Sequence, residues 1–199
     1  SSLRERSEAD DAVLSNIDKK SIIVVNGEYD RVQIVLDALE MKYTEIVPHQ
    51  LEKVELNPTQ TLLINCPGNM SRKSITNIRK FVEDGGLLVT TDWALRNVLE
   101  PAFPGYVRYN DKPTSDDVVR IEFVGEGIDA LDGFIEQGSS PLWWLEGSSY
   151  PIQIIDKENV VLLIKSKEME KKYGEEPIAI KFKYGQGEIY HIVSHFYLQ

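Results

Sequence analysis

The sequence lacks the features that mark secreted, membrane-spanning and nucleic-acid-binding proteins. Its one cysteine, Cys66, cannot form a disulfide within the chain, which is typical of a reducing compartment. There is no run of about eighteen apolar residues and no apolar leader-like segment at the start. The net charge of −10 leaves little basic surface for nucleic acid or for an anionic membrane. We therefore predict a cytoplasmic protein with neither as a partner.

Glycine-rich phosphate loops are also missing. The chain has no G-x-G-x-x-G motif and no G-x-x-x-x-G-K-[ST] motif. The first predicted strand is followed by Asn26-Gly27-Glu28, which puts a carboxylate where a phosphate would lie. We therefore expect no nucleotide and no other cofactor.

The region from residue 21 to about residue 100 alternates between two hydrophobic patterns. Continuous aliphatic runs predict buried strands at 21–25, 44–47, 61–64 and 87–91. Apolar residues at helical spacing follow three of these runs, and the expected caps of the helices are Asp30, Ser71 or Ser74, and Asp92. Strands that alternate with helices imply right-handed crossovers and a parallel sheet.

After about residue 105 the pattern favours further strands. They are expected at 118–124, 142–145, 152–155, 160–164, 178–184 and 188–194, with loops and a short helix between 125 and 138. The last two should form an antiparallel hairpin that turns at Gly185-Gln186-Gly187. We predict an α/β fold, a flavodoxin-like (Rossmann-like) three-layer sandwich with a mostly parallel central sheet and antiparallel C-terminal strands. Residues 21–199 form one domain, preceded by an arm or loosely docked helix at 1–20.

Candidate functional residues follow the predicted strands, because ligands of open α/β sheets bind at the carboxyl ends of the strands. Asp92 and His195 are the candidate catalytic residues. The candidate binding residues are Glu28, Asn69, Trp93 and His191. Asp92 also fits a helix cap, and the two histidines also fit ordinary buried positions. No cysteine or carboxylate cluster in the sequence completes a metal site around them, so we expect no metal.

Cys66 is a weak candidate nucleophile. A catalytic cysteine on such a sheet favours a G-x-C-x-G elbow, but the sequence reads Ile64-Asn65-Cys66-Pro67-Gly68. Pro67 has no N–H to donate to an oxyanion. We interpret Cys66 as a small residue of the core or of a loop.

Three segments resemble the class I glutamine amidotransferase-like superfamily, in particular its ThuA-like and related non-amidotransferase branches. They are the strand and turn at 63–68, the helix, Gly-Gly and strand at 81–89, and the final strand at 184–195 that ends in His195. The resemblance covers residues 21–199 at the level of pattern and implies the strand order 2-1-3-4. The family's nucleophilic cysteine follows the Gly-Gly strand, where this chain has Asp92, and its His-x-Glu pair is represented only by His195.

We therefore expect no glutaminase activity, and two functions are open. One is a non-catalytic binding or interaction domain, part of a longer protein because the chain opens on Ser1 and stops on apolar residues. The alternative is a hydrolase or related enzyme that uses Asp92 and His195 on a small, sugar-like molecule. An open cleft with these two side chains in hydrogen-bond reach favours the enzyme, and a cleft filled by aromatic side chains favours the binding domain. The partner is a small polar molecule or a protein, in an oligomeric state that the sequence does not specify.

Overall fold

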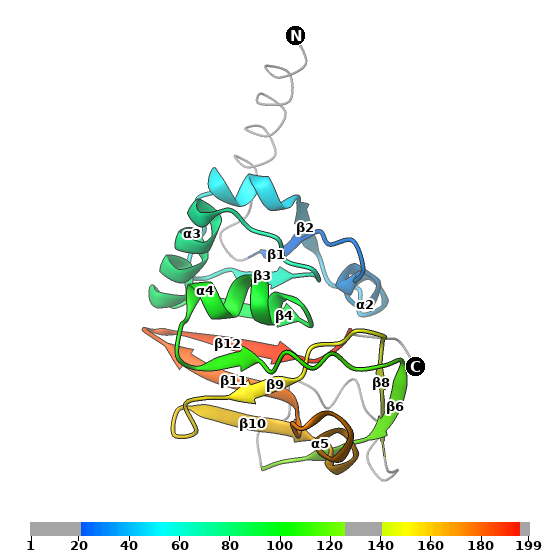
Figure 1. Ribbon diagram of the computed structural model, residues 1–199. Coiled ribbons are helices and arrows are strands. Elements are labelled where there is room, and N and C mark those ends of the chain that lie inside the picture. The colour runs from blue at the N-terminus through cyan, green and yellow to red at the C-terminus, as the bar shows by residue number, and fades with distance from the viewer. Residues whose placement is uncertain (1–20, 126–140, 196–199) are drawn as a thin grey trace.

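A mixed eight-stranded sheet forms the centre of the computed structural model, which describes residues 21–125 and 141–195 (Figure 1). Its strands in chain order are β1 (Ile22–Val25), β2 (Tyr43–Ile46), β3 (Thr61–Ile64), β4 (Leu87–Thr91), β7 (Glu122–Phe123), β10 (Val160–Lys165), β11 (Pro177–Tyr184) and β12 (Gly187–Ile192). Across the sheet the order is β2-β1-β3-β4-β12-β11-β10-β7. The pairs from β2 to β12 are parallel, and the pairs from β12 to β7 are antiparallel.

The helices follow strands of the parallel half, except the last one, which joins β10 to β11 in the antiparallel half. In chain order the helical segments are α2 (Val32–Ala38), the 3₁₀ helix η1 (Pro48–Glu52), α3 (Arg72–Glu83), the π-type helix η2 (Leu95–Leu99), α4 (Glu100–Ala102) and α5 (Lys167–Tyr173). Ser71 caps α3, because its side-chain oxygen accepts a hydrogen bond from the backbone N–H of Ser74.

Alternate residues of the parallel strands pack against different helices, which gives the fold its three layers. Val24 of β1 and Leu63 of β3 form a small cluster with Val32 of α2. Their sequence neighbours, such as Ile23, belong to the main core, which includes Ile78 of α3. Because successive side chains of a strand point to opposite faces, α2 and α3 cover opposite faces of the sheet. The chain is therefore an α/β three-layer sandwich of the flavodoxin-like (Rossmann-like) kind.

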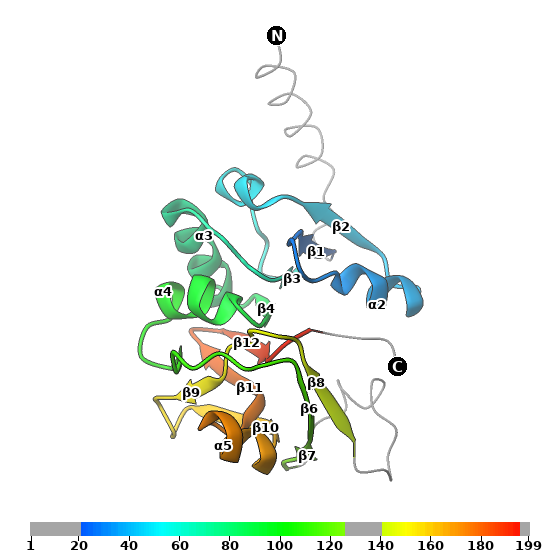
Figure 2. The same ribbon diagram turned by 45° about the vertical axis from the view of Figure 1, so that its right-hand side comes forward.

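Two small ribbons lie beside the main sheet. One pairs β5 (Val107–Tyr109) with β9 (Ile152–Ile154), and the other pairs β6 (Asp117–Arg120) with β8 (Leu142–Leu145), as Figure 2 shows. Trp143 anchors β8, because its indole N–H donates to the backbone oxygen of Val193 directly after β12. The adjacent Trp144 is partly exposed, so the two tryptophans have the different environments that alternation in a strand requires.

Most of the predicted elements are confirmed, including the strand order 2-1-3-4 and the hairpin of β11 and β12. The predicted strand at 118–124 is wrong, since it divides into β6 and β7, which belong to different sheets. The predicted cap of α2 by Asp30 is also wrong, because the backbone N–H of Val32 donates to the side chain of Asn65 instead. Residues 1–20 and nearly all of the predicted loop region at 125–138 lie outside the described residues.

Among the residues that the structure describes, no helix has the length and apolar character needed to cross a membrane.

Candidate functional site at the carboxyl edge of the sheet

The carboxyl ends of β1, β3, β4 and β12 meet at one edge of the sheet, because these four strands run parallel. Ionisable side chains converge there from separate parts of the chain. We call them the edge cluster, and its members are Asp30, Cys66, Asp92, Glu146 and His195.

Asp92 sits in a strained turn between β4 and η2. Its φ is 41°, a backbone conformation that residues other than glycine adopt at a cost and that is common at functional sites. Its carboxylate Oδ1 accepts a hydrogen bond of 2.8 Å from the backbone N–H of Tyr150. The expected side-chain cap is therefore absent, and Leu95 donates to the backbone oxygen of Asp92 instead. This arrangement directs the carboxylate toward the edge cluster.

His195 is held beside Asp92 by a second carboxylate. Its Nδ1 lies 2.5 Å from Oε2 of Glu146, and its Nε2 lies 3.9 Å from Oδ2 of Asp92. The backbone N–H of Glu146 donates to the hydroxyl of Ser194, which fixes Glu146 against the end of the last strand. A carboxylate on Nδ1 orients the ring and leaves Nε2 facing Asp92, the arrangement found for histidines that accept protons or bind metals.

Cys66 follows β3 at a point where two segments of backbone almost touch. A Cβ on Gly27 would lie 2.0 Å from the backbone oxygen of Cys66, and that oxygen accepts a hydrogen bond from the N–H of Glu28. The thiol is buried, and burial raises its pKa to about 12. Because this pKa is far above neutral, a nucleophilic thiolate is disfavoured at Cys66, as the sequence predicted.

Residues 146–150, which we call the covering loop, close over this edge. Besides the bonds of Glu146 and Tyr150, the loop accepts a hydrogen bond of 2.7 Å from the indole N–H of Trp93 at the backbone oxygen of Ser148. Tyr150 stacks on Trp93, while Tyr29 meets the same indole edge-on. The aromatic side chains thus form one wall of the site.

The site holds more negative than positive groups. Asp30, Asp92 and Glu146 face the single imidazole of His195, and the carboxylate of Asp30 accepts a hydrogen bond of 2.6 Å from Thr91. Burial raises the pKa of Asp30 and raises that of Asp92 to about 6. A neutral or cationic ligand therefore fits this environment better than a phosphate does.

Of the predicted site residues, Asp92 and His195 come together and Trp93 lies beside them. His191 is buried within β12, where its Nδ1 bonds to the hydroxyl of Thr90. Glu28 and Asn69 are exposed, and no side-chain contact joins them to the edge cluster among the described residues.

Sequence reasoning missed Asp30 and Glu146. Asp30 was interpreted as a helix cap, and Glu146 lies beyond the strands that form the edge. A carboxylate followed by Gly147-Ser148-Ser149 is the one signal that could have suggested a functional turn at the covering loop.

Three of these side chains have the chemistry of metal ligands. A sulfur of Cys66, a carboxylate oxygen of Asp92 and a ring nitrogen of His195 all lie within 4.8 Å of one another. The sequence places Asp92 with His195 but predicts no cysteine or carboxylate cluster that completes a metal site, and β3, β4 and β12 bring Cys66 to that pair in the fold.

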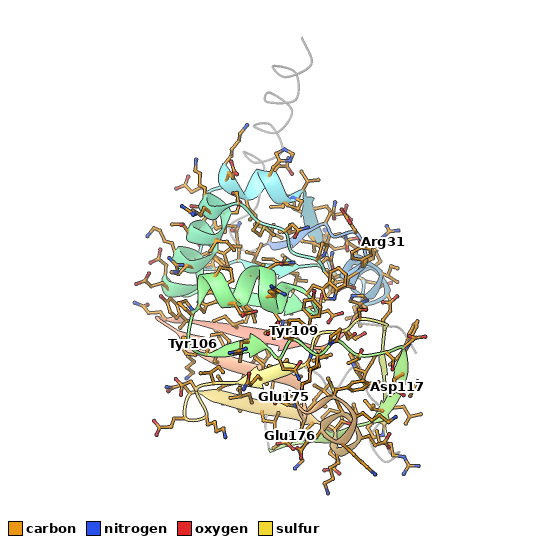
Figure 3. All side chains as sticks on the ribbon, in the orientation of Figure 1. Arg31, Tyr106, Tyr109, Asp117, Glu175 and Glu176 are labelled. Atoms are coloured by element: carbon orange, nitrogen blue, oxygen red, sulfur yellow. The ribbon has the colours of Figure 1, made fainter. Side chains whose placement is uncertain are left out.

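A separate cavity of about 420 Å³ lies near α5, with Glu175 and Glu176 on its wall (Figure 3). Its apolar residues include Ile154 and Leu162. None of the residues that line it belongs to the edge cluster.

No protein-family model matches this sequence, and a search of curated proteins gives no significant match. Solved structures share the fold. A cold-adapted β-galactosidase from Rahnella sp. R3 is 16% identical with a TM-score of 0.60, over 86% of this chain and 28% of that enzyme. A carbohydrate deacetylase, Agd3, is 10% identical with a TM-score of 0.56, over 88% of this chain and 29% of that protein. This chain therefore spans less than a third of either enzyme.

The match to a cytoplasmic protein from Salmonella typhimurium LT2 extends over nearly the whole of both chains. It has a TM-score of 0.60 and 11% identity, and it covers 90% of this chain and 89% of that one. At these identities the similarities establish the fold alone.

Proposed function

We propose that this protein is a hydrolase that acts on a small, polar, sugar-like molecule at the carboxyl edge of its sheet. The observation that carries the proposal is the series of contacts from Glu146 to His195 to Asp92 at the end of the parallel strands. A histidine with a carboxylate on one nitrogen and a second polar group facing the other has the geometry of a general base.

In the proposed reaction His195 accepts a proton from a water molecule placed beside Asp92. Glu146 holds the ring in position and stabilises its charged form as the proton arrives. Asp92, fixed at Oδ1 by Tyr150, positions that water molecule with Oδ2. The oxygen of that water molecule then bonds to the carbonyl or anomeric carbon of the substrate, the ester or glycosidic C–O bond breaks, and the leaving oxygen takes the proton back from the imidazolium of His195.

Two observations support a sugar-like substrate. Trp93 and Tyr29 form an aromatic wall beside the cluster, and Tyr29 is 56% exposed. Apolar ring faces and polar groups in one site are the general features of a small-molecule pocket. In addition, sugar-active enzymes contain regions with this fold.

The proposal is tested with purified full-length chain on a panel of nitrophenyl glycosides and acetylated sugars. We expect Asp92→Asn and His195→Gln each to lower kcat/KM by about 100-fold or more, the usual contribution of acid–base catalysis. Asp111→Asn is the matched control, since Asp111 also has a positive φ but is exposed and forms its ion pairs with Arg96 and Arg108, outside the cluster. Hydrolysis that survives both cluster variants would contradict the proposal.

A second candidate is the non-catalytic binding or interaction domain, and the burial of the cluster favours it. Asp92 is only 3% exposed and His195 only 4%, and aromatic side chains contact Trp93 on two sides. The separation of 3.9 Å between Nε2 of His195 and Oδ2 of Asp92, longer than a hydrogen bond, also supports this second candidate. Saturable sugar binding in NMR titrations, with no turnover of any compound in the panel, would favour this function.

Two further parts of the proposal rest on the sequence. The resemblance to the class I glutamine amidotransferase-like superfamily is supported by the place of Asp92, at the turn where that family has its nucleophile. Without a cysteine at this turn, glutaminase activity is not expected. A cytoplasmic location is supported by the single cysteine, which is free and buried.

A further inference from the structure

We propose that Cys66, Asp92 and His195 bind a divalent transition-metal ion, with zinc as the best fit. Their donor atoms lie within 4.8 Å of one another, and all three side chains are buried. They come from the ends of three adjacent strands, β3, β4 and β12, so the sheet itself fixes their relative positions. The inference rests on the proposed hydrolase at the same edge and changes its account of water activation: a bound ion would occupy Nε2 of His195 and lower the pKa of a coordinated water molecule, whose proton would pass to solvent and not to His195.

The donor set selects the class of metal. Thiolate sulfur, imidazole nitrogen and carboxylate oxygen are the three side-chain donors that zinc accepts, whereas magnesium and calcium prefer oxygen alone. Three protein ligands leave the fourth tetrahedral position for a water molecule, which is the pattern of catalytic rather than structural zinc sites.

The geometry is close to that of a zinc site. Ligand atoms about 2.1 Å from a tetrahedral zinc ion lie about 3.4 Å apart. The distance from Nε2 of His195 to Oδ2 of Asp92 is 3.9 Å, so binding needs a contraction of about half an ångström between these two atoms.

The surrounding hydrogen bonds direct the correct atoms at the proposed ion. Glu146 lies against Nδ1 of His195 and leaves Nε2 as the ligand, the outer contact that metal-binding histidines commonly make. The backbone N–H of Tyr150 occupies Oδ1 of Asp92 and leaves Oδ2 as the ligand. These two contacts distinguish the site from a chance meeting of polar side chains.

The charge of the site also favours a cation. Three carboxylates, from Asp30, Asp92 and Glu146, surround one histidine at an edge where Asp30 and Asp92 are buried. Buried charges are expensive unless an opposite charge accompanies them. A divalent cation supplies that charge, with Asp30 adding to the attraction from outside the three ligands.

Titration of the metal-stripped full-length chain with Co²⁺ and Zn²⁺ tests the inference. We expect one equivalent of Co²⁺ to bind with the visible bands of a tetrahedral ion and a near-ultraviolet sulfur-to-cobalt band, and Zn²⁺ to displace it. Cys66→Ser should abolish the sulfur band, and His195→Gln should weaken binding by more than 100-fold. Glu146→Gln should weaken it by about 10- to 100-fold. His49→Gln is the control and should change nothing.

The outcomes separate this inference from the proposed function. Cobalt that binds without a sulfur band, or equally well to Cys66→Ser, would overturn the metal site. Hydrolysis that persists after chelation, with no metal bound, would overturn the role of the ion in activating water while leaving the hydrolase intact. Metal binding without hydrolysis of any compound would support the metal site and contradict the hydrolase. If a variant fails to fold, a zinc-dependent rise in the Tm of the unaltered chain still decides, and no rise would overturn the metal site.

Discussion

The interior of the sheet and its carboxyl edge each contain a histidine, one in apolar surroundings and the other among carboxylates. His191 is the penultimate residue of β12, where it pairs with Thr90 and Ile180, and among the described residues its Nε2 has no hydrogen-bond partner. His195, four positions later, lies among carboxylates of the edge cluster. The interior excludes charge, whereas the edge gathers it. The position of a residue along the strand therefore decides whether a histidine belongs to the core or to the site.

The largest expected loss of stability comes from a substitution at Gly27, where two segments of backbone meet at the carboxyl edge of the sheet. A Cβ at Gly27 would lie 2.0 Å from the backbone oxygen of Cys66, and backbone cannot move aside as a flexible side chain can. We expect Gly27→Ala to lower the free energy of unfolding by about 3 kcal/mol or more, as overpacking does in tight sites. Urea denaturation measures this loss.

Gly147→Ala is the matched control for that substitution. Its Cβ would meet Asp116 at 3.5 Å, an ordinary van der Waals distance, and the change should cost less than about 1 kcal/mol. Equal losses for the two variants would show that the contact between Gly27 and Cys66 is not tight.

The second prediction concerns the pH dependence of stability that the buried His191 produces. Burial lowers the pKa of His191 from 6.5 to about 3, so the unfolded chain binds a proton that the folded chain refuses. This contribution to stability is complete above pH 6.5 and is lost as the pH falls toward 3. The slope is about 1.4 kcal/mol per pH unit for one proton.

The measurement compares urea denaturation of the unaltered chain and His191→Asn between pH 7 and pH 4.5. The asparagine keeps a polar atom near the hydroxyl of Thr90 but does not titrate. We expect the difference between the two chains to shrink by about 2 to 3 kcal/mol over this range. A pH profile of stability that His191→Asn leaves unchanged would contradict the prediction.

The third prediction concerns Asn65, a polar residue that is buried like the interior of the sheet but follows β3 at the carboxyl edge. The side chain of Asn65 accepts a hydrogen bond from the N–H of Val32 and donates one of 2.9 Å to Gln33. Asn65→Ala leaves a buried N–H without its acceptor, so we expect a loss of about 2 kcal/mol in thermal or urea unfolding. Asn69→Ala, at an exposed position nearby, should cost less than about 0.5 kcal/mol. A similar loss of stability for both variants would contradict a structural role for the hydrogen bonds of Asn65.

The smallest expected effect compares a charge pair of the edge with one on the surface. Glu146→Gln weakens a contact to the buried His195, but Glu146 is itself partly exposed, so we expect a loss of only about 1 kcal/mol. Asp84→Asn removes the same charge from the exposed pair with Lys80 on α3 and should cost less than about 0.5 kcal/mol. Urea denaturation measures both losses. A larger loss for Asp84→Asn than for Glu146→Gln would contradict the prediction that the charge pair of the edge stabilises the fold more than the surface pair.

Local sequence determined most of the elements. The run at Thr61–Ile64 and the run at Leu87–Thr91 become β3 and β4 with the predicted bounds, because short apolar runs between turn signals favour a strand buried on both faces. The turn at Gly185 and Gln186 joins β11 to β12, since glycine adopts the required backbone conformation. Asp92 and His195 could be placed at the edge for the same reason: each follows a strand that could be recognised.

Only the tertiary structure decided what those two residues meet. Asp30 and Glu146 reach the edge from a turn and from the covering loop, far from Asp92 in sequence, and no periodic pattern records such an approach. Cys66 follows a strand that the sequence predicts, but only the folded sheet shows that its sulfur lies within 4.8 Å of donor atoms of Asp92 and His195. Hydrophobic periodicity is local and specifies single helices and strands. Which charged side chains meet at a site depends instead on which strands and loops become neighbours in the folded sheet.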